Sequence, residues 1–295
     1  MRETRAPVRT GGVKAGVNVS RRRELAVGRL RVSFEAPPGY DEAPLLAWLE
    51  RCAAAVALYY GEFPVPLARV SIDLFDGAGI HGGQARPTSP PSVVIRVGTR
   101  SSARQFERNW SMTHELVHLA FPNVQDQHHW IEEGLATYVE PIARARLGWI
   151  TEDDVWAEWI ENMPLGVPRT RGLDQDSSWA ATYWGGALFC LLADIEIREH
   201  TAGRFGLEHA LRAIVAAGGT LSERWPLTRA LETGDRATGT TALMDTYHTL
   251  ADHPRDIDLP ALWRKLGVST QTGSVHYDDT APNAALRRTI IAAPH

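Results

Sequence analysis

Two motifs constrain the fold of this chain most strongly: HELVH at positions 114–118 and WIEEGLA at positions 130–136. In a helix, residues four apart lie on one face about a turn apart, so His114 and His118 can present two imidazoles to one metal ion. HExxH on a helix is the signature of zinc hydrolases in which the glutamate acts as general base. A chain that binds zinc through HExxH must pack a second segment against this helix, because a catalytic zinc usually has three protein ligands and the two histidines supply only two.

Glu133 is the best candidate for the third ligand. It precedes Gly134, and a glycine allows two helix backbones to approach closely. The rival ligands are His128 and His129, which lie between the two motifs, and Glu132. We expect the two histidines to be surface or supporting groups at the start of the second helix. Glu132 points about 100° round the helix from Glu133, so one of the two glutamates faces the metal.

The chemistry that this site predicts is metal-assisted hydrolysis. One Zn²⁺ per chain would bring the pKa of water down to roughly 7. Glu115, which is not itself a ligand, would take up the proton as general base, and attack on a carbonyl follows.

The residues around HELVH favour a metal site. The alternative is that His114 and His118 are buried histidines whose hydrogen bonds go to other protein groups. Ser102 followed by Gln105 forms a capping box, and apolar residues recur at helical spacing until Pro122. A helix buried nearly all round must provide partners for its polar groups, because unpaired buried polar groups are costly.

Composition excludes several classes of function. The chain has 295 residues, of which 44% are hydrophobic and 22% charged, which suits one large domain or two lobes. The net charge of −4 gives no sign of nucleic-acid binding, and no stretch of 18 apolar residues predicts a membrane span. No apolar signal segment is visible, so we expect a cytoplasmic protein. We expect Cys52 and Cys190 to be buried free thiols, although the sequence leaves open whether they pair.

The order of patterns predicts an α+β fold with a small N-terminal mixed sheet lobe and a mainly helical C-terminal lobe. We expect a disordered basic arm over 1–24, the sheet lobe over 25–100 and the helical lobe with the zinc site over 101–290, with 25–290 forming one catalytic unit. The predicted strands are 25–34, 69–75 and 92–97, with a glycine-rich loop before the last. The predicted helices are 43–60, 102–120, 128–147, 152–161, 179–200, 204–217, 223–232, 239–251 and 259–266. The metal helix would lie at the junction of the lobes, where a sheet edge can hold an extended peptide.

HELVH together with WIEEGLATY at 130–138 resembles the gluzincin metallopeptidases, the clan of thermolysin and aminopeptidase N. More narrowly, YYGEFP at 59–64 and YWGGAL at 183–188 are similar to segments of the glycyl aminopeptidase family. The resemblance covers roughly residues 40–290. It implies a thermolysin-like catalytic domain, a peptide or protein substrate, and the glutamate before the glycine, Glu133, as third ligand.

By this resemblance, Tyr183 hydrogen-bonds the oxyanion of the tetrahedral intermediate, while an interfacial tyrosine packed near Trp179 and Trp184 is the alternative. We expect no counterpart of the family's N-terminal β-domain or of its PDZ-like segment. The loop at 76–86 also lacks the glutamate that holds a free amine in aminopeptidase relatives, so amino- and endopeptidase activity both stay open. Gly82 and Gly83 of this loop would line the cleft.

Three functions therefore follow from the sequence. The first is a zinc peptidase. The second is a catalytically silent gluzincin-like domain that binds proteins. In the third, the two motifs never meet and the protein is a helical interaction domain.

Overall fold

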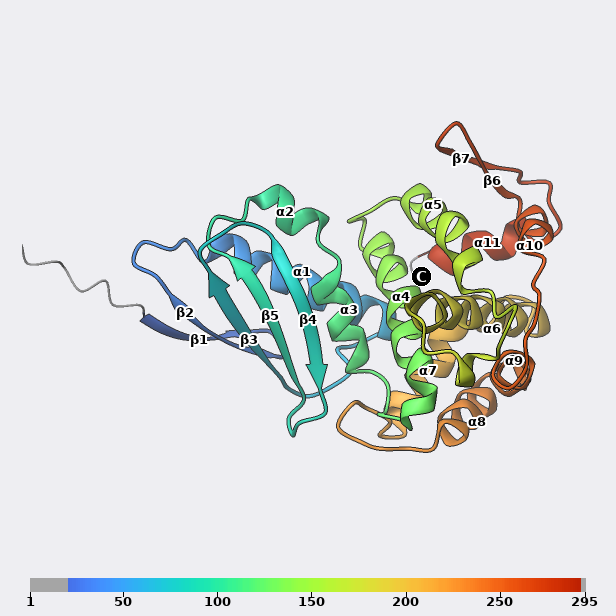
Figure 1. The fold of residues 1–295 in the computed structure, drawn as a ribbon, viewed down its shortest axis with the longest axis horizontal. Coiled ribbons are helices and arrows are strands. Elements are labelled where there is room, and N and C mark those ends of the chain that lie inside the picture. Colours follow the sequence, from blue (N-terminus) through green and yellow to red (C-terminus); the bar gives the residue numbers. More distant parts are fainter. Residues whose placement is uncertain (1–20, 293–295) are drawn as a thin grey trace, which may run out of the picture.

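A five-stranded mixed sheet begins the part of the chain that the computed structural model describes, residues 21–292 (Figure 1). The strands lie in the order β1-β2-β3-β5-β4. β2 and β3 are parallel, as are β3 and β5, while β1 and β4 run antiparallel to their neighbours at the two edges. The strands are β1 Arg21–Val27, β2 Leu30–Ala36, β3 Ala68–Phe75, β4 Ile80–Arg86 and β5 Ser92–Gly98.

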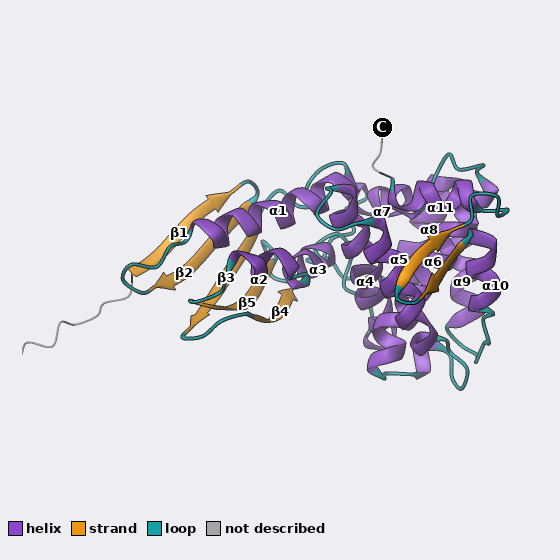
Figure 2. Cartoon of the chain, turned by 90° about the horizontal axis from the view of Figure 1, so that it is seen from above, coloured by secondary structure: helices purple, strands orange, loops and turns teal. Residues whose placement is uncertain are grey.

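One face of the sheet is covered by helices, which Figure 2 shows from above. In β2, alternate residues from Leu30 to Ala36 are buried, and β3 shows the same period of two from Ala68 to Ile72. These apolar rows face α1, Ala43–Tyr60, an 18-residue helix that ends at Gly61. Gly61 adopts the left-handed conformation that commonly ends helices.

The sheet differs from the predicted one in two places. The strand expected over 25–34 is two strands, because Gly28 turns the chain with a φ of +55°. The expected loop contains β4, an edge strand with a bulge between His81 and Gly83. Its sequence, IHGGQAR, lacks apolar alternation because this strand is mostly exposed or half-buried. Of the expected basic arm, residues 1–20 lie outside the described part, and residues 21–24 belong to β1.

The rest of the described chain is mainly helical, which agrees with the predicted fold class. The α-helices that follow are α2 Ala103–Arg108, α3 Ser111–His118, α4 His129–Arg146, α5 Glu152–Asn162, α6 Gly186–His200, α7 Leu207–Ala216, α8 Leu227–Thr238, α9 Ala242–Leu250, α10 Leu259–Leu266 and α11 Ala284–Ile291. Shorter helical segments are η1 Asp126–His128, η2 Met163–Gly166, η3 Leu173–Gln175 and η4 Ala181–Gly185. A hairpin of β6 Val268–Gln271 and β7 Ser274–Tyr277 was not predicted.

The single helix expected over 102–120 is two helices. The capping box of Ser102 and Gln105 does begin α2. Asn109 then leaves the helical conformation, and its side-chain oxygen accepts a hydrogen bond from the N–H of Ser111 at 3.1 Å. Because an asparagine side chain can satisfy a free N–H at a helix start, the chain begins α3 in a new direction.

Two glycines let α4 and α6 touch backbone to backbone. A Cβ on Gly134 would lie 2.2 Å from the carbonyl carbon of Gly186, and a Cβ on Gly186 would lie 2.1 Å from the carbonyl oxygen of Trp130. The structure therefore confirms the close helix approach expected at Gly134. The crossing sets the position of Glu133, the residue before it.

We expect Gly134→Ala to lower the free energy of unfolding by about 2 kcal/mol or more, since overpacking a filled interior typically costs 1–3 kcal/mol. The added methyl group would meet backbone, which cannot move aside as a side chain can. Urea unfolding followed by circular dichroism measures the change. The exposed helical position Glu232, changed to Ala, is the control and should stay within about 0.5 kcal/mol. Equal stability of Gly134→Ala and wild type would contradict the close crossing.

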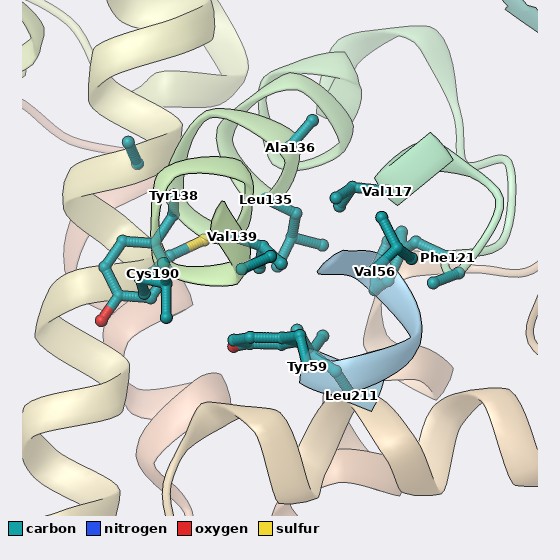
Figure 3. Packing of buried hydrophobic residues seen from close by; sticks show 14 of the residues in the cluster. Val56, Tyr59, Val117, Phe121, Leu135, Ala136, Tyr138, Val139, Cys190 and Leu211 are labelled. Carbon is teal, nitrogen blue, oxygen red and sulfur yellow. The ribbon is translucent and has the colours of Figure 1, made fainter. Parts of the chain in front are cut away.

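The core joins the sheet side to the helical side through α1, which contacts α3, α4 and α7. Figure 3 shows Val56 and Tyr59 of α1 beside Leu135 and Val139 of α4 and Leu211 of α7. These residues form one continuous apolar cluster. The helix that carries Glu133 is therefore held against the sheet part of the molecule.

A buried ion pair fixes the middle of α6. Asp194 accepts hydrogen bonds from the Arg198 guanidinium at 2.9 Å, from the Tyr138 hydroxyl at 2.8 Å and from the N–H of Leu207 at 2.7 Å. Such a group is stable when buried because each charge has partners. It has a structural role, since it ties α4, α6 and the start of α7 together.

Cys52 and Cys190 are both buried and free, as the sequence predicts. Burial raises the pKa of the Cys52 thiol to about 12, so it stays protonated at neutral pH. Across residues 21–292, no helix combines the length and the apolar character that a membrane crossing needs.

Candidate metal centre

Three side chains from two helices converge on one point. The Nε2 atom of His114 lies 3.1 Å from Oε2 of Glu133, and Nε2 of His118 lies 3.7 Å from the same oxygen. One ligand atom from each of the three residues lies within 4.8 Å of the others, and the described residues contain no second group of this kind. A tetrahedral zinc with ligand distances of about 2.0–2.1 Å separates its ligand atoms by roughly 3.3 Å. The arrangement therefore fits a zinc ion with small adjustments.

The pKa values of His118 and Glu133 suit the binding of a divalent cation. Burial, with the nearby His114, lowers the pKa of His118 to about 3, so its imidazole is neutral and can act as a ligand. Burial alone would raise the pKa of Glu133, but the hydrogen bond with His114 and the neighbouring His118 lower it to about 2. Two imidazole nitrogens and one carboxylate oxygen are a common donor set of catalytic zinc sites.

The rival ligands are directed to other partners. His128 is buried, and its Nδ1 atom lies 2.8 Å from Oδ1 of Asp174. The Nδ1 atom of His129 lies 2.8 Å from Oε2 of Glu132, and its Nε2 atom lies 3.4 Å from Oε1 of Glu133. The other oxygen of Glu132 accepts from the N–H of Val124 at 3.2 Å.

Glu115 lies beside the three residues and is held by the sheet. Its Oε2 atom accepts a hydrogen bond from the N–H of Ala85 in β4 at 2.6 Å. Burial raises the pKa of its carboxyl group above the ordinary value. A raised pKa suits a group that must take up a proton near neutral pH.

Gly83 is the point where β4 passes over this carboxylate. A Cβ at position 83 would lie 2.4 Å from Cγ of Glu115, so a side chain there would collide with the glutamate. Gly83 lines the cleft. Gly82 sits at the bulge with a φ of +54° and does not line the cleft, and a Cβ there would meet nothing within 4 Å. The prediction that both glycines line the cleft is therefore correct for Gly83 and wrong for Gly82.

Tyr183 stands over the site on η4, a π-helical turn at the start of α6. Its ring stacks on the His114 ring at 6.1 Å between centroids, and on Trp179 at 5.8 Å. Burial, followed by the charge of the Glu133 carboxylate, raises the pKa of Tyr183 to about 12. The hydroxyl is therefore a proton donor at neutral pH, and π-helical turns are frequent at functional sites.

Glu115, His118, Glu133 and Tyr183 line a cleft with a volume of about 730 Å³ between the sheet edge and the helical part. Its lining comprises Gly83, Gln84, Ala85, Pro87, Glu115, His118, Phe121, Asn123, Val124, Asp126, His129, Glu132, Glu133, Tyr183 and Leu221. The free edge of β4 thus borders the candidate metal centre.

Two contributors to the site carry no local signal in the sequence. Asp174 accepts hydrogen bonds from the indole of Trp130 at 2.7 Å and from the hydroxyl of Tyr247 at 3.0 Å, which fixes the start of α4. The N–H of Ala85 is a backbone group. Both depend on contacts between segments far apart in the chain.

Sequence comparisons do not identify a family: no protein-family model matches the chain, and a search of curated proteins finds no match either. Solved structures with a similar fold do exist. An aminopeptidase N family protein from Idiomarina loihiensis aligns over 85% of this chain and 50% of its own length, with 16% identity and a TM-score of 0.61. A two-domain M1 zinc metallopeptidase bound to L-tryptophan aligns over 81% of this chain and 53% of its own, with 19% identity and a TM-score of 0.51.

A third structure, an M1 zinc metallopeptidase from Deinococcus radiodurans bound to a Tyr-Ser-Ala substrate, aligns over 81% of this chain and 54% of its own, with 17% identity and a TM-score of 0.50. The chain spans about half the length of these proteins. At these identities the likeness shows a shared fold, an N-terminal mixed sheet followed by a mainly helical region.

Proposed function

We propose that this protein is a zinc-dependent peptidase of the gluzincin type, related most closely to the glycyl aminopeptidase family. The observation that carries the proposal is the convergence of His114, His118 and Glu133 beside Glu115, in a cleft that one edge of the sheet borders. The fold shared with zinc metallopeptidases supports it.

The proposed reaction divides the work between the metal and the chain. Zinc held by His114, His118 and Glu133 would supply a Lewis acid that activates water and polarises the substrate carbonyl. Glu115 accepts a proton from the attacking water and later delivers it to the leaving amine. Tyr183 donates its hydroxyl proton in a hydrogen bond to the oxygen on which negative charge develops.

The proposed substrate is a peptide or a protein segment in extended conformation. β4 pairs with β5 along one edge, and no strand within residues 21–292 pairs with its other edge. An extended peptide can add to such an edge through main-chain hydrogen bonds, which bind many sequences alike.

The test is an activity screen with zinc-loaded protein over peptides with free and with blocked N-termini. Cleavage that is lost with a chelator and regained with zinc supports the proposal, and the two peptide sets separate aminopeptidase from endopeptidase activity. A protein that holds about one zinc per chain and cleaves no peptide would instead favour the catalytically silent binding domain.

Replacing Tyr183 by Phe should lower kcat by about 10²–10³ with little change in KM, because the lost donor acts mainly where charge develops in the transition state. The phenylalanine ring preserves the stack with His114 and Trp179. Steady-state kinetics on any peptide cleaved in the screen measures the change. A tyrosine that only packs between its neighbours would give a variant with unchanged kcat.

A further inference from the structure

A second pocket adjoins the candidate metal centre at the other end of β4. It has a volume of about 350 Å³ and is lined by Gly79, Ile80, Ser102, Arg104, Gln105, Arg108, Asn109 and Trp110. We call it the arginine pocket. Trp110 links it to the metal centre, because the indole is half exposed and its ring packs edge-on against the His114 ring at 5.2 Å.

Helix stability accounts for at most one of the two arginines of this pocket, because Arg108 stands in the last turn of α2, where the helix dipole favours a cation, and Arg104 does not. Arg104 and Arg108 lie four residues apart on a six-residue helix, a spacing at which like charges repel. Arg104 also stands in the first turn, where the helix dipole disfavours a cation. Neither forms an ion pair with a carboxylate in residues 21–292, and the one acidic residue of α2, Glu107, lies 3.8 Å from Arg51 instead.

The opposite side of the metal centre carries the opposite charge. Asp126 and Glu132 line the main cleft together with the two glutamates of the site. The carboxylates of the main cleft therefore lie on one side of the metal centre, and the two arginines of the second pocket lie on the other.

Resting on the proposed peptidase function, we propose that the arginine pocket is a subsite for a carboxylate of the peptide substrate. Gly83 lies against the general base and Ile80 lines the pocket, three positions earlier in β4. Because of the bulge, Ile80 pairs with Val97 and Gly83 with Ile95, so the two lie two ladder positions apart, about 7 Å at roughly 3.3 Å per residue. The carboxylate therefore lies about two residues from the bond that is cleaved. It belongs either to an Asp or Glu side chain or to the free C-terminus of a short peptide.

Binding to the zinc-loaded Glu115→Gln variant tests this subsite without hydrolysis. Fluorescence anisotropy would compare three labelled peptides that are otherwise identical: one neutral with an amidated C-terminus, one with a single Glu, and one with a free C-terminus. We expect the carboxylate to strengthen binding about 10-fold at low salt, an advantage that falls as salt screens the charges. The preferred peptide tells which source of carboxylate the pocket accepts.

The advantage should disappear when Arg104→Gln and Arg108→Gln are added, and should reverse with Arg104→Glu and Arg108→Glu. Arg236→Gln with Arg264→Gln is the matched control, because it removes the same charge from exposed positions on α8 and α10. Thermal unfolding should be nearly unchanged in all of these variants. Equal affinity for the neutral and acidic peptides, or an advantage that survives the loss of both pocket arginines, overturns the subsite.

Hydrolysis of the same peptides by the wild-type protein separates the two proposals. Cleavage of neutral and acidic peptides at equal rates, with no effect of the arginine variants, would remove the subsite and leave the peptidase. Arginine-dependent binding without cleavage would remove the peptidase and leave the subsite.

Discussion

Glu115→Gln is expected to lower peptide hydrolysis by about 10²–10⁴ while the zinc content stays at about one per chain. The amide has the size of the carboxylate, and its oxygen can still accept the hydrogen bond from the N–H of Ala85. It cannot take up a proton, so the variant lacks the base and keeps the shape of the site. Elemental analysis and kinetics on the same preparation measure both quantities.

Glu232→Gln provides the control for this experiment, since it removes the same charge from an exposed position on α8. It should cleave at the wild-type rate. A Glu115→Gln variant that also cleaves at the wild-type rate would rule out the proposed base.

Glu133→Ala should abolish or greatly reduce zinc binding. Only His114 and His118 would remain as ligands. The Oε2 atom of Glu133, which lies near the Nε2 atoms of both histidines, would be lost. Because a ligand that binds the folded state stabilises it, zinc at 100 times its Kd should add about 2.7 kcal/mol to the stability of the wild type. The variant should show no such gain. Zinc content and thermal unfolding with and without a chelator measure the two effects.

Zinc retained at full occupancy in Glu133→Ala would transfer the third-ligand role to a neighbour. His129 is the first alternative, since its Nε2 atom lies 3.4 Å from the glutamate that was removed. A double variant that also carries His129→Ala would then lose the metal. No zinc in either the wild type or the variant would remove the metal site altogether.

The sequence predicted the parts of the site that depend on local periodicity. The spacing of His114 and His118 places them on one helix face. Gly134 predicted a close helix crossing next to Glu133. The two helices therefore had to meet for any metal to bind. Tyr183 was identified by resemblance, and the structure places its ring against His114.

The sequence did not predict the parts that depend on distant contacts. β4 has two adjacent glycines and little apolar alternation, so it had the pattern of a loop until its pairing with β5 was known. Asp174 fixes the start of α4 through side chains from two other segments. The break of the metal helix at Asn109 was hidden by apolar positions that continue through it. For β4 and Asp174 the deciding interactions join residues far apart in the chain, which a sliding window does not compare. At Asn109 the hydrogen bond to Ser111 is local, and the apolar periodicity on both sides outweighed it in the prediction.

The hydrogen bond from Ala85 to Glu115 divides the site between two parts of the molecule. The three residues that would hold zinc belong to α3 and α4, whereas Glu115, the proposed proton acceptor, is tethered to an edge strand. A displacement of β4 would shift that acceptor and leave the metal ligands in place. For the proposed peptidase, turnover and metal occupancy can therefore vary independently, and a fully metallated preparation can still hydrolyse peptides slowly.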